Sequence, residues 1–175
     1  RHGGDLWQRG HAWIDLGNAG MAGLTRAAII AVGSELLTPS KLDTNSLFIT
    51  EQLNLVGIDV VWKSQIGDDR EQLASALRFA LASADLVVCC GGLGPTDDDV
   101  TRDVVARVLD RPLLEDERIT TRIRARFEAR RMEMTTINRR QAMVPMGARV
   151  IDNPNGTAPG LWMEMGGQAV LLLPG

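Results

Sequence analysis

Short apolar runs alternate with longer amphipathic stretches from residue 27 onward. The runs predict buried strands, and they lie at Ala27–Val32, Ile58–Ile66 and Leu86–Cys90. Amphipathic stretches follow over 43–56, 68–83 and 100–109, and the first two open on Asp or Thr, which are favourable helix N-caps. The first helix is expected to bury its apolar residues, Leu47, Phe48, Leu53, Leu55 and Val56. Alternating strands and helices with short connections predict a parallel sheet covered on both faces, an α/β sandwich.

The second half of the chain begins with helical patterns and ends with strand patterns. Pro112 breaks the chain, and helices are predicted over 115–131 and 137–143. Strands are predicted at the end of the chain, with Gly166-Gly167 joining the last two as a hairpin: Arg149–Ile151, Leu161–Met165 and Gln168–Leu173. The arginines between 118 and 140 are spread round the helix among acidic residues. This arrangement predicts a solvated helix or a subunit contact rather than a nucleic-acid surface.

Residues 1–25 differ from the rest of the chain because they show no sustained periodicity. They hold both histidines, His2 and His11, and five glycines before Met21. We expect an upstream extension or an artificial addition here, with Met21 as a candidate natural start. The folded domain is expected to cover residues 26–175.

The segment after the predicted strand at 86–90 points most directly to chemistry. Gly91, Gly92 and Gly94 precede Thr96 and a run of three aspartates, Asp97–Asp99. Glycine permits close approach of the backbone to a ligand, and a helix N-terminus is a seat for phosphate. Because three carboxylates would repel a bare phosphate, a bridging cation such as Mg²⁺ is expected. Helix capping alone would explain one aspartate, not three.

Three familiar phosphate motifs are absent from the sequence. No Gly-Lys-Ser/Thr of a Walker A loop is present, and Gly92-Leu93-Gly94 lacks the third glycine of a dinucleotide fingerprint. The Glu-rich signature of a Nudix hydrolase is also missing. The glycine-aspartate segment therefore predicts a phosphate-ester or nucleotide site of another kind.

Two further segments carry residues suited to the same site. Gly33, Ser34 and Glu35 follow the first strand, and Asp43 and Asn45 open the next helix, although Asp43 also suits simple capping. Ligands in such sheets bind beyond the carboxyl ends of the strands, so residues 33–45 and 91–101 are expected at one edge. The loop over 153–160 is rich in Gly, Pro and Asn and is expected to close over the ligand, through Asn155, Gly156, Thr157 and Ala158.

Composition and charge narrow the choice of partners and compartment. The chain has 175 residues and a formal net charge of −3, which gives no reason to expect nucleic acid or an anionic membrane. No apolar stretch approaches the ~20 residues of a membrane helix. Cys89 and Cys90 are adjacent in a predicted strand, so they are interpreted as core residues in a reducing compartment, by default the cytoplasm.

Together these segments resemble the N-terminal domain of the CinA (competence/damage-inducible protein A) family, within the wider molybdopterin-binding fold of the MoaB/MogA type. The resemblance extends over about 27–175 and rests on five segments in order: Val32-Gly33-Ser34-Glu35-Leu36-Leu37, Asp43-Thr44-Asn45, Gly91-Gly92-Leu93-Gly94-Pro95-Thr96-Asp97-Asp98, Arg140-Gln141-Ala142 and Asn155-Gly156-Thr157-Ala158-Pro159-Gly160. Ser34 stands where the family commonly has Thr, and the hydroxyl is kept.

The resemblance implies a three-layer α/β/α fold and Mg²⁺-dependent hydrolysis of ADP-ribose to AMP and ribose 5-phosphate. On this hypothesis Asp97, Asp98 and Glu35 hold the metal and carry the chemistry, while Asp43 and Asn45 orient the ribose or base. The N–H groups of the three glycines and the Thr96 hydroxyl would contact phosphate oxygens. Family habit suggests a homo-oligomer. Many CinA proteins add a nicotinamide mononucleotide deamidase domain, so the chain is expected to be truncated at its C-terminal end.

Two alternatives from other functional classes remain open on the sequence alone. The same glycine loop and aspartates would suit a module that carries or adenylylates molybdopterin, because that ligand also bears a phosphate. The domain could also bind a nucleotide without catalysis inside a larger CinA-like protein. Copurified pterin would favour the first, and thermal stabilisation by ADP-ribose without turnover would favour the second.

Overall fold

A six-stranded, mostly parallel sheet forms the centre of the computed structural model, which describes residues 23–175. The strand order is β2-β1-β3-β8-β7-β6, and the first four strands run parallel. Their bounds are β1 Arg26–Val32, β2 Asp59–Ile66, β3 Leu86–Cys90, β6 Arg149–Ile151, β7 Gly160–Met165 and β8 Gln168–Leu173. The predicted strands are confirmed. Residues 1–22 of the predicted N-terminal extension, including His2 and His11, lie outside the described residues.

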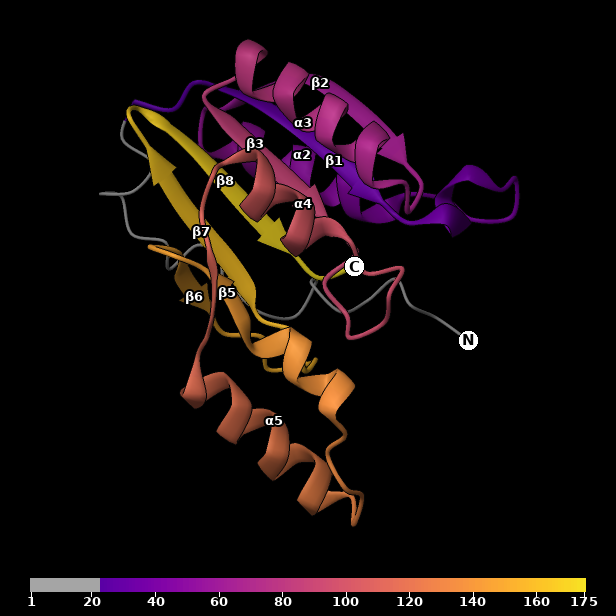
Figure 1. Cartoon of the computed structure of the whole chain (residues 1–175). Helices are drawn as coiled ribbons and strands as arrows, with labels where there is room; N and C mark the ends of the chain where they lie inside the picture. Colours follow the sequence, from indigo (N-terminus) through magenta and orange to yellow (C-terminus); the bar gives the residue numbers. More distant parts are fainter. Residues whose placement is uncertain (1–22) are drawn as a thin grey trace.

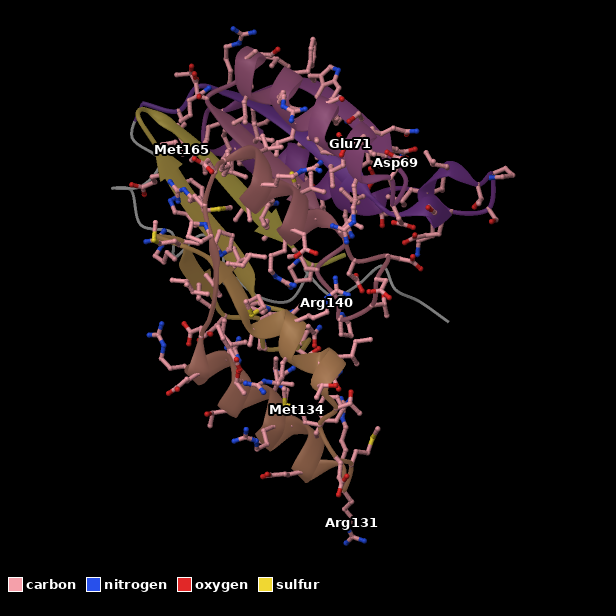
Figure 2. All side chains as sticks on the ribbon, in the orientation of Figure 1. Asp69, Glu71, Arg131, Met134, Arg140 and Met165 are labelled. Atoms are coloured by element: carbon pink, nitrogen blue, oxygen red, sulfur yellow. The ribbon has the colours of Figure 1, made fainter. Side chains whose placement is uncertain are left out.

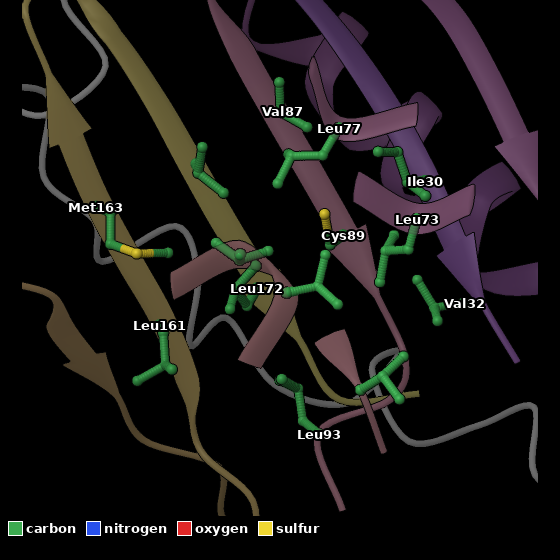
Figure 3. Close-up of a cluster of buried hydrophobic side chains, with 14 of the residues drawn as sticks. Ile30, Val32, Leu73, Leu77, Val87, Cys89, Leu93, Leu161, Met163 and Leu172 are labelled. Atoms are coloured by element: carbon green, nitrogen blue, oxygen red, sulfur yellow. The ribbon is translucent and has the colours of Figure 1, made fainter. Parts of the chain in front are cut away.

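Helices cover both faces of this sheet (Figure 1). Helices α3 (Arg70–Ser83) and α4 (Thr101–Val108) pack on one face, and α2 (Thr44–Leu55) packs on the other. The apolar residues of β1 contribute to the core on both faces of the sheet. Ile30 faces α3, while Ile29 packs with the residues of α2. Figure 3 shows the larger of the two core clusters, where Leu77 of α3 lies beside Val87 of β3 and Leu73 of α3 lies near Val32 of β1. The predicted α/β/α arrangement is confirmed.

Side-chain caps begin the helices close to the predicted positions. Asp43 accepts a hydrogen bond from the Ser46 N–H at 2.9 Å, and Asp69 accepts from Glu71 and Gln72 at 2.9 and 2.8 Å. The predicted apolar side of α2 is only partly correct. Leu53 is buried as expected and Phe48 is half-buried, but the helix otherwise buries Ser46 and Ile49. Leu47, Leu55 and the capping residue Val56 are exposed.

A lobe formed by residues 113–145 extends below the sheet in Figure 1. It contains β4 (Leu113–Glu115), α5 (Glu117–Ala129), the 3₁₀ helix η3 (Thr136–Ala142) and β5 (Met143–Pro145). The prediction of one helix over 115–131 was wrong at its start, because Glu115 pairs in β4 and Asp116 caps α5. The second predicted helix is 3₁₀ rather than α, and the pairing of β4 with β5 was not predicted.

The last strands bring a loop back to the carboxyl edge of the parallel strands. Gly166 and Gly167 adopt positive φ, 51° and 95°, in the turn between β7 and β8, which confirms the predicted hairpin. Strand β7 is antiparallel to both of its neighbours, so the loop between β6 and β7 lies at the edge where β1, β3 and β8 end. None of the helices among the described residues is long and apolar enough to cross a membrane.

The adjacent cysteines are core residues, as predicted, with exposures of 0% for Cys89 and 4% for Cys90. Burial raises the pKa of both thiols from 9.0 to about 12. Since the folded pKa exceeds the unfolded one, the neutral thiols stabilise the fold below about pH 9, and this contribution is lost as the pH rises toward 12.

We expect thiolate absorbance to be absent from the native protein at about pH 10 and present in urea at the same pH. The sequence has no tyrosine to obscure this ultraviolet titration. Native thiolate at about pH 9 would contradict the prediction.

Candidate functional site

A cavity of about 600 Å³ opens at the carboxyl edge of the sheet. It lies among the loops that follow β1 and β3, the loop between β6 and β7, and the end of β8. Twelve of the predicted site residues line it: Gly33, Glu35, Asp43, Asn45, Gly91, Gly92, Gly94, Asp98, Asn155, Gly156, Thr157 and Ala158. The expected meeting of residues 33–45 and 91–101 at one edge is confirmed.

Asp99 shapes the loop after β3, a role that the sequence did not reveal. Its carboxylate accepts hydrogen bonds from the Gly94 N–H at 2.7 Å and from the Thr96 N–H at 2.9 Å. The Thr96 hydroxyl also donates to it, at 2.6 Å. These donors are therefore engaged within the loop, which does not support the hypothesis that Gly94 and Thr96 contact phosphate.

Other backbone donors of the same loop have no partner among the described residues. The Gly91 N–H donates to the Leu173 carbonyl at 2.9 Å, so this predicted phosphate contact is also occupied. The N–H groups of Gly92 and Leu93, two cavity-lining residues, donate to nothing in residues 23–175. An anion bound in the cavity would satisfy such donors.

Asp97 lies outside the cavity lining, with a side chain that is 97% exposed. It forms an ion pair with Arg140, whose Nη1 lies 2.7 Å from its carboxylate, and Arg140 also donates to the Thr96 carbonyl at 3.1 Å. Figure 2 shows Arg140 on the side of the lobe nearest α4. Ser34 also lies outside the lining, and its hydroxyl accepts from the Asp68 N–H at 3.2 Å. Asp97 and Ser34 thus contact neighbouring protein groups.

Arg102 is a buried positioning group that sequence reasoning missed. It is only 3% exposed, and its guanidinium donates to the carbonyls of Leu93 and Arg140 at 2.7 Å each. Burial lowers its pKa to about 10, so it remains charged at neutral pH. The available signal was its place on the buried stripe of α4, three and four residues before Val105 and Ala106.

Asn153 organises the loop between β6 and β7. Its side-chain oxygen accepts from the N–H groups of Asn155 and Gly156 at 3.0 and 3.1 Å. Its amide nitrogen donates to the Ala158 carbonyl at 2.9 Å. The predicted ligand-facing residues of this loop are therefore held in place by hydrogen bonds within the loop itself.

The charges around the cavity bear on whether a metal fits. Five carboxylates line it, Glu35, Asp43, Asp68, Asp98 and Asp99, and Lys41 is the only basic lining residue in the described part of the chain. No three Asp, Glu, His or Cys side chains of residues 23–175 converge as a metal-binding group. The trio predicted to hold the metal, Asp97, Asp98 and Glu35, is thus not assembled.

Magnesium nevertheless suits the carboxylates that remain. It is commonly bound by one or two carboxylates together with substrate phosphates and water. Glu35 and Asp98 line the cavity, and Glu35 folds over Gly33, where a Cβ would lie 2.5 Å from its Oε2. A bound cation would offset the excess of negative charge and so favour the entry of an anionic phosphate.

Comparison with known proteins agrees with this geometry. Residues 28–175 match the family described as probable molybdopterin binding domain. MoaB from Thermus thermophilus, a molybdopterin biosynthesis enzyme, has the same fold, with a TM-score of 0.57 and 22% identity over 87% of this chain and 82% of that chain. The chain therefore belongs to the molybdopterin-binding domain family.

Within this family, the predicted resemblance to CinA is confirmed. The crystal structure of the protein CinA from Thermoplasma acidophilum gives a TM-score of 0.79, with 36% identity over 88% of this chain and 90% of that chain. A CinA-like protein from Solibacter usitatus (strain Ellin6076) is 50% identical over 149 residues, which are 85% of this chain and 36% of the relative. A CinA-like protein from Koribacter versatilis (strain Ellin345) is 46% identical over 85% of this chain and 37% of the relative. The chain thus spans little more than a third of the curated relatives it matches.

Proposed function

We propose that the cavity binds a nucleotide through its phosphates and hydrolyses ADP-ribose to AMP and ribose 5-phosphate with Mg²⁺. One observation carries the proposal: the N–H groups of Gly92 and Leu93, which have no partner within residues 23–175, share a single cavity with Lys41 and an excess of carboxylates. The N–H groups and the ammonium suit phosphate oxygens, and the carboxylates suit a hard cation. A pyrophosphate with bound Mg²⁺ presents both charges in one ligand.

The residues divide the work by chemistry. Gly92, Leu93 and Lys41 bind the pyrophosphate, and Asp43 and Asn45 orient the ribose or base. Glu35 and Asp98 would hold Mg²⁺, which supplies charge neutralisation of the phosphates and acidification of water. In the hydrolysis, a water oxygen forms a bond to one phosphorus and the bond from that phosphorus to the bridging oxygen breaks. The bridging oxygen leaves on the second phosphate, and the two protons of the water are released to solvent as both products become phosphate monoester dianions.

The test is incubation of the purified chain with ADP-ribose and Mg²⁺, followed by chromatography for AMP. We expect AMP in equal amount to ribose 5-phosphate, and none when EDTA removes the metal. AMP formation that persists in EDTA would exclude the metal-dependent reaction. Thermal stabilisation by ADP-ribose without AMP would instead identify a noncatalytic nucleotide-binding domain.

Molybdopterin binding is the second candidate, because the matched family is described by that ligand. A pterin phosphate would use the same N–H groups of Gly92 and Leu93 without needing hydrolysis. Fluorescence of a pterin that copurifies with the chain, together with absence of AMP formation, would favour this function over the first.

A further inference from the structure

The lobe of residues 113–145 binds the loop between β6 and β7 through two arginines of α5. Arg122 pairs with the Asp152 carboxylate at the start of the loop, and Arg126 binds the loop backbone. Arg126 donates from Nη1 to the Gly156 carbonyl, and from Nη2 to the carbonyls of Pro154 at 2.8 Å and Asn153 at 3.2 Å. Three backbone carbonyls of one loop thus converge on one guanidinium. Because Asn153 and Gly156 line the cavity, Arg126 fixes part of its wall from outside.

The same lobe also binds the glycine loop on the other side of the cavity. Arg140 of η3 donates to the Thr96 carbonyl at 3.1 Å and to the Asp97 carboxylate at 2.7 Å. Its own carbonyl accepts from buried Arg102, which also holds the Leu93 carbonyl. The glycine loop is therefore attached to η3 at several points.

Glu115 joins the two elements that carry these arginines. Its carboxylate accepts from the Thr120 hydroxyl of α5 at 2.8 Å. It also accepts from Arg139 of η3, at 3.2 Å from Nε and 2.8 Å from Nη2. Ile123 of α5 and Ala142 of η3 belong to one buried cluster. The lobe is thus one packed unit in contact with both loops.

We propose that Arg126 is a positioning residue of the candidate site, and that the lobe holds the two ligand-facing loops at a fixed separation through Arg126 and Arg140. The Arg126 guanidinium holds the backbone of one cavity wall in place. This corrects the expectation that the arginines of this helix are solvated or form a subunit contact. The effect of Arg126 on catalysis rests on the proposed function. The effect of Arg126 on the order of the two loops does not depend on that function.

Hydrogen exchange of the intact chain, followed by mass spectrometry, tests without substrate whether Arg126 affects the order of both loops. In Arg126→Gln we expect exchange to rise about tenfold or more in residues 153–157, where the hydrogen bonds are lost. We also expect a smaller rise at the Gly94 and Thr96 amides, which donate to Asp99 and which Arg126 does not touch. Arg124→Gln is the matched control, because Arg124 is exposed on the same helix and donates to neither loop in the described structure.

The outcomes separate coupling from general damage. Faster exchange in both loops, with α3 unchanged, supports the proposal, and so does recovery of slow exchange in Arg126→Lys. A change confined to residues 153–157, or an equal change in Arg124→Gln, would overturn it. If ADP-ribose is turned over, Arg126→Gln should raise KM about tenfold and leave kcat within about twofold. A pure fall in kcat would contradict the positioning role, whereas absence of turnover in the unmodified chain refutes only the proposed function.

Discussion

Asp98→Asn is expected to lower ADP-ribose turnover by about 100-fold or more, whereas Asp97→Asn should cost less than about fivefold. The two carboxylates are neighbours in sequence, but only Asp98 lines the cavity. Asp97 is exposed and paired with Arg140, so its loss weakens one attachment of the loop. Removing the Asp98 charge removes a group that would hold the cation against the pyrophosphate.

The measurement is AMP formation at saturating and limiting ADP-ribose over a range of Mg²⁺ concentrations. Asp97→Asn serves as the matched control, since it makes the same chemical change one residue away. Equal loss of activity in both variants would show that the loop as a whole, rather than Asp98, carries the effect. Full activity in Asp98→Asn would remove it from the site.

The strands and the layers were predictable because their signals are local. Runs such as Leu86–Cys90 are apolar throughout, as a strand buried on both faces requires. Asp43 and Asp69 mark helix starts by side-chain capping, which depends on residues only two or three positions away. The carboxyl-edge position of the glycine loop then follows from parallel pairing alone.

The lobe was harder to predict because its short strands depend on distant partners. Leu113–Glu115 has three residues and pairs with Met143–Pro145, about thirty positions further along the chain. From its local sequence alone, Glu115 is predicted to lie in the first turn of a helix. Glu115 connects α5 and η3 through hydrogen bonds with Thr120 and Arg139, and these contacts form only in the folded chain.

The different contacts of three consecutive aspartates could not be predicted either, because they depend on the folded shape of the loop. Helix α4 begins at Thr101, close to its predicted start at residue 100, and the three aspartates lie in the turn before it. A turn points successive side chains in different directions. Asp97 therefore faces Arg140, Asp98 reaches the cavity, and Asp99 binds the backbone of its own loop.

Gly91→Ala is expected to lower the free energy of unfolding by more than about 4 kcal/mol, an exceptional cost for one methyl group. Gly91 has φ of +103°, and a Cβ there would lie 2.1 Å from the Val32 carbonyl oxygen. The obstacle is the backbone at the end of β1, the strand paired with β3, and backbone cannot turn aside as a side chain would. The glycine is thus required by the packing of β3 on β1, in addition to any ligand.

Gly57→Ala is the matched control that separates strain from collision. Gly57 ends α2 with φ of +80°, but a Cβ there meets nothing within 4 Å. The Gly57→Ala substitution should lower the free energy of unfolding by about 1–2 kcal/mol, the cost of placing a side chain in the left-handed conformation. Urea unfolding of both variants measures the difference, which we attribute to the contact with Val32. Equal losses would mean that the loop after β3 can move away from β1, and the cavity edge would then be less fixed than its hydrogen bonds indicate.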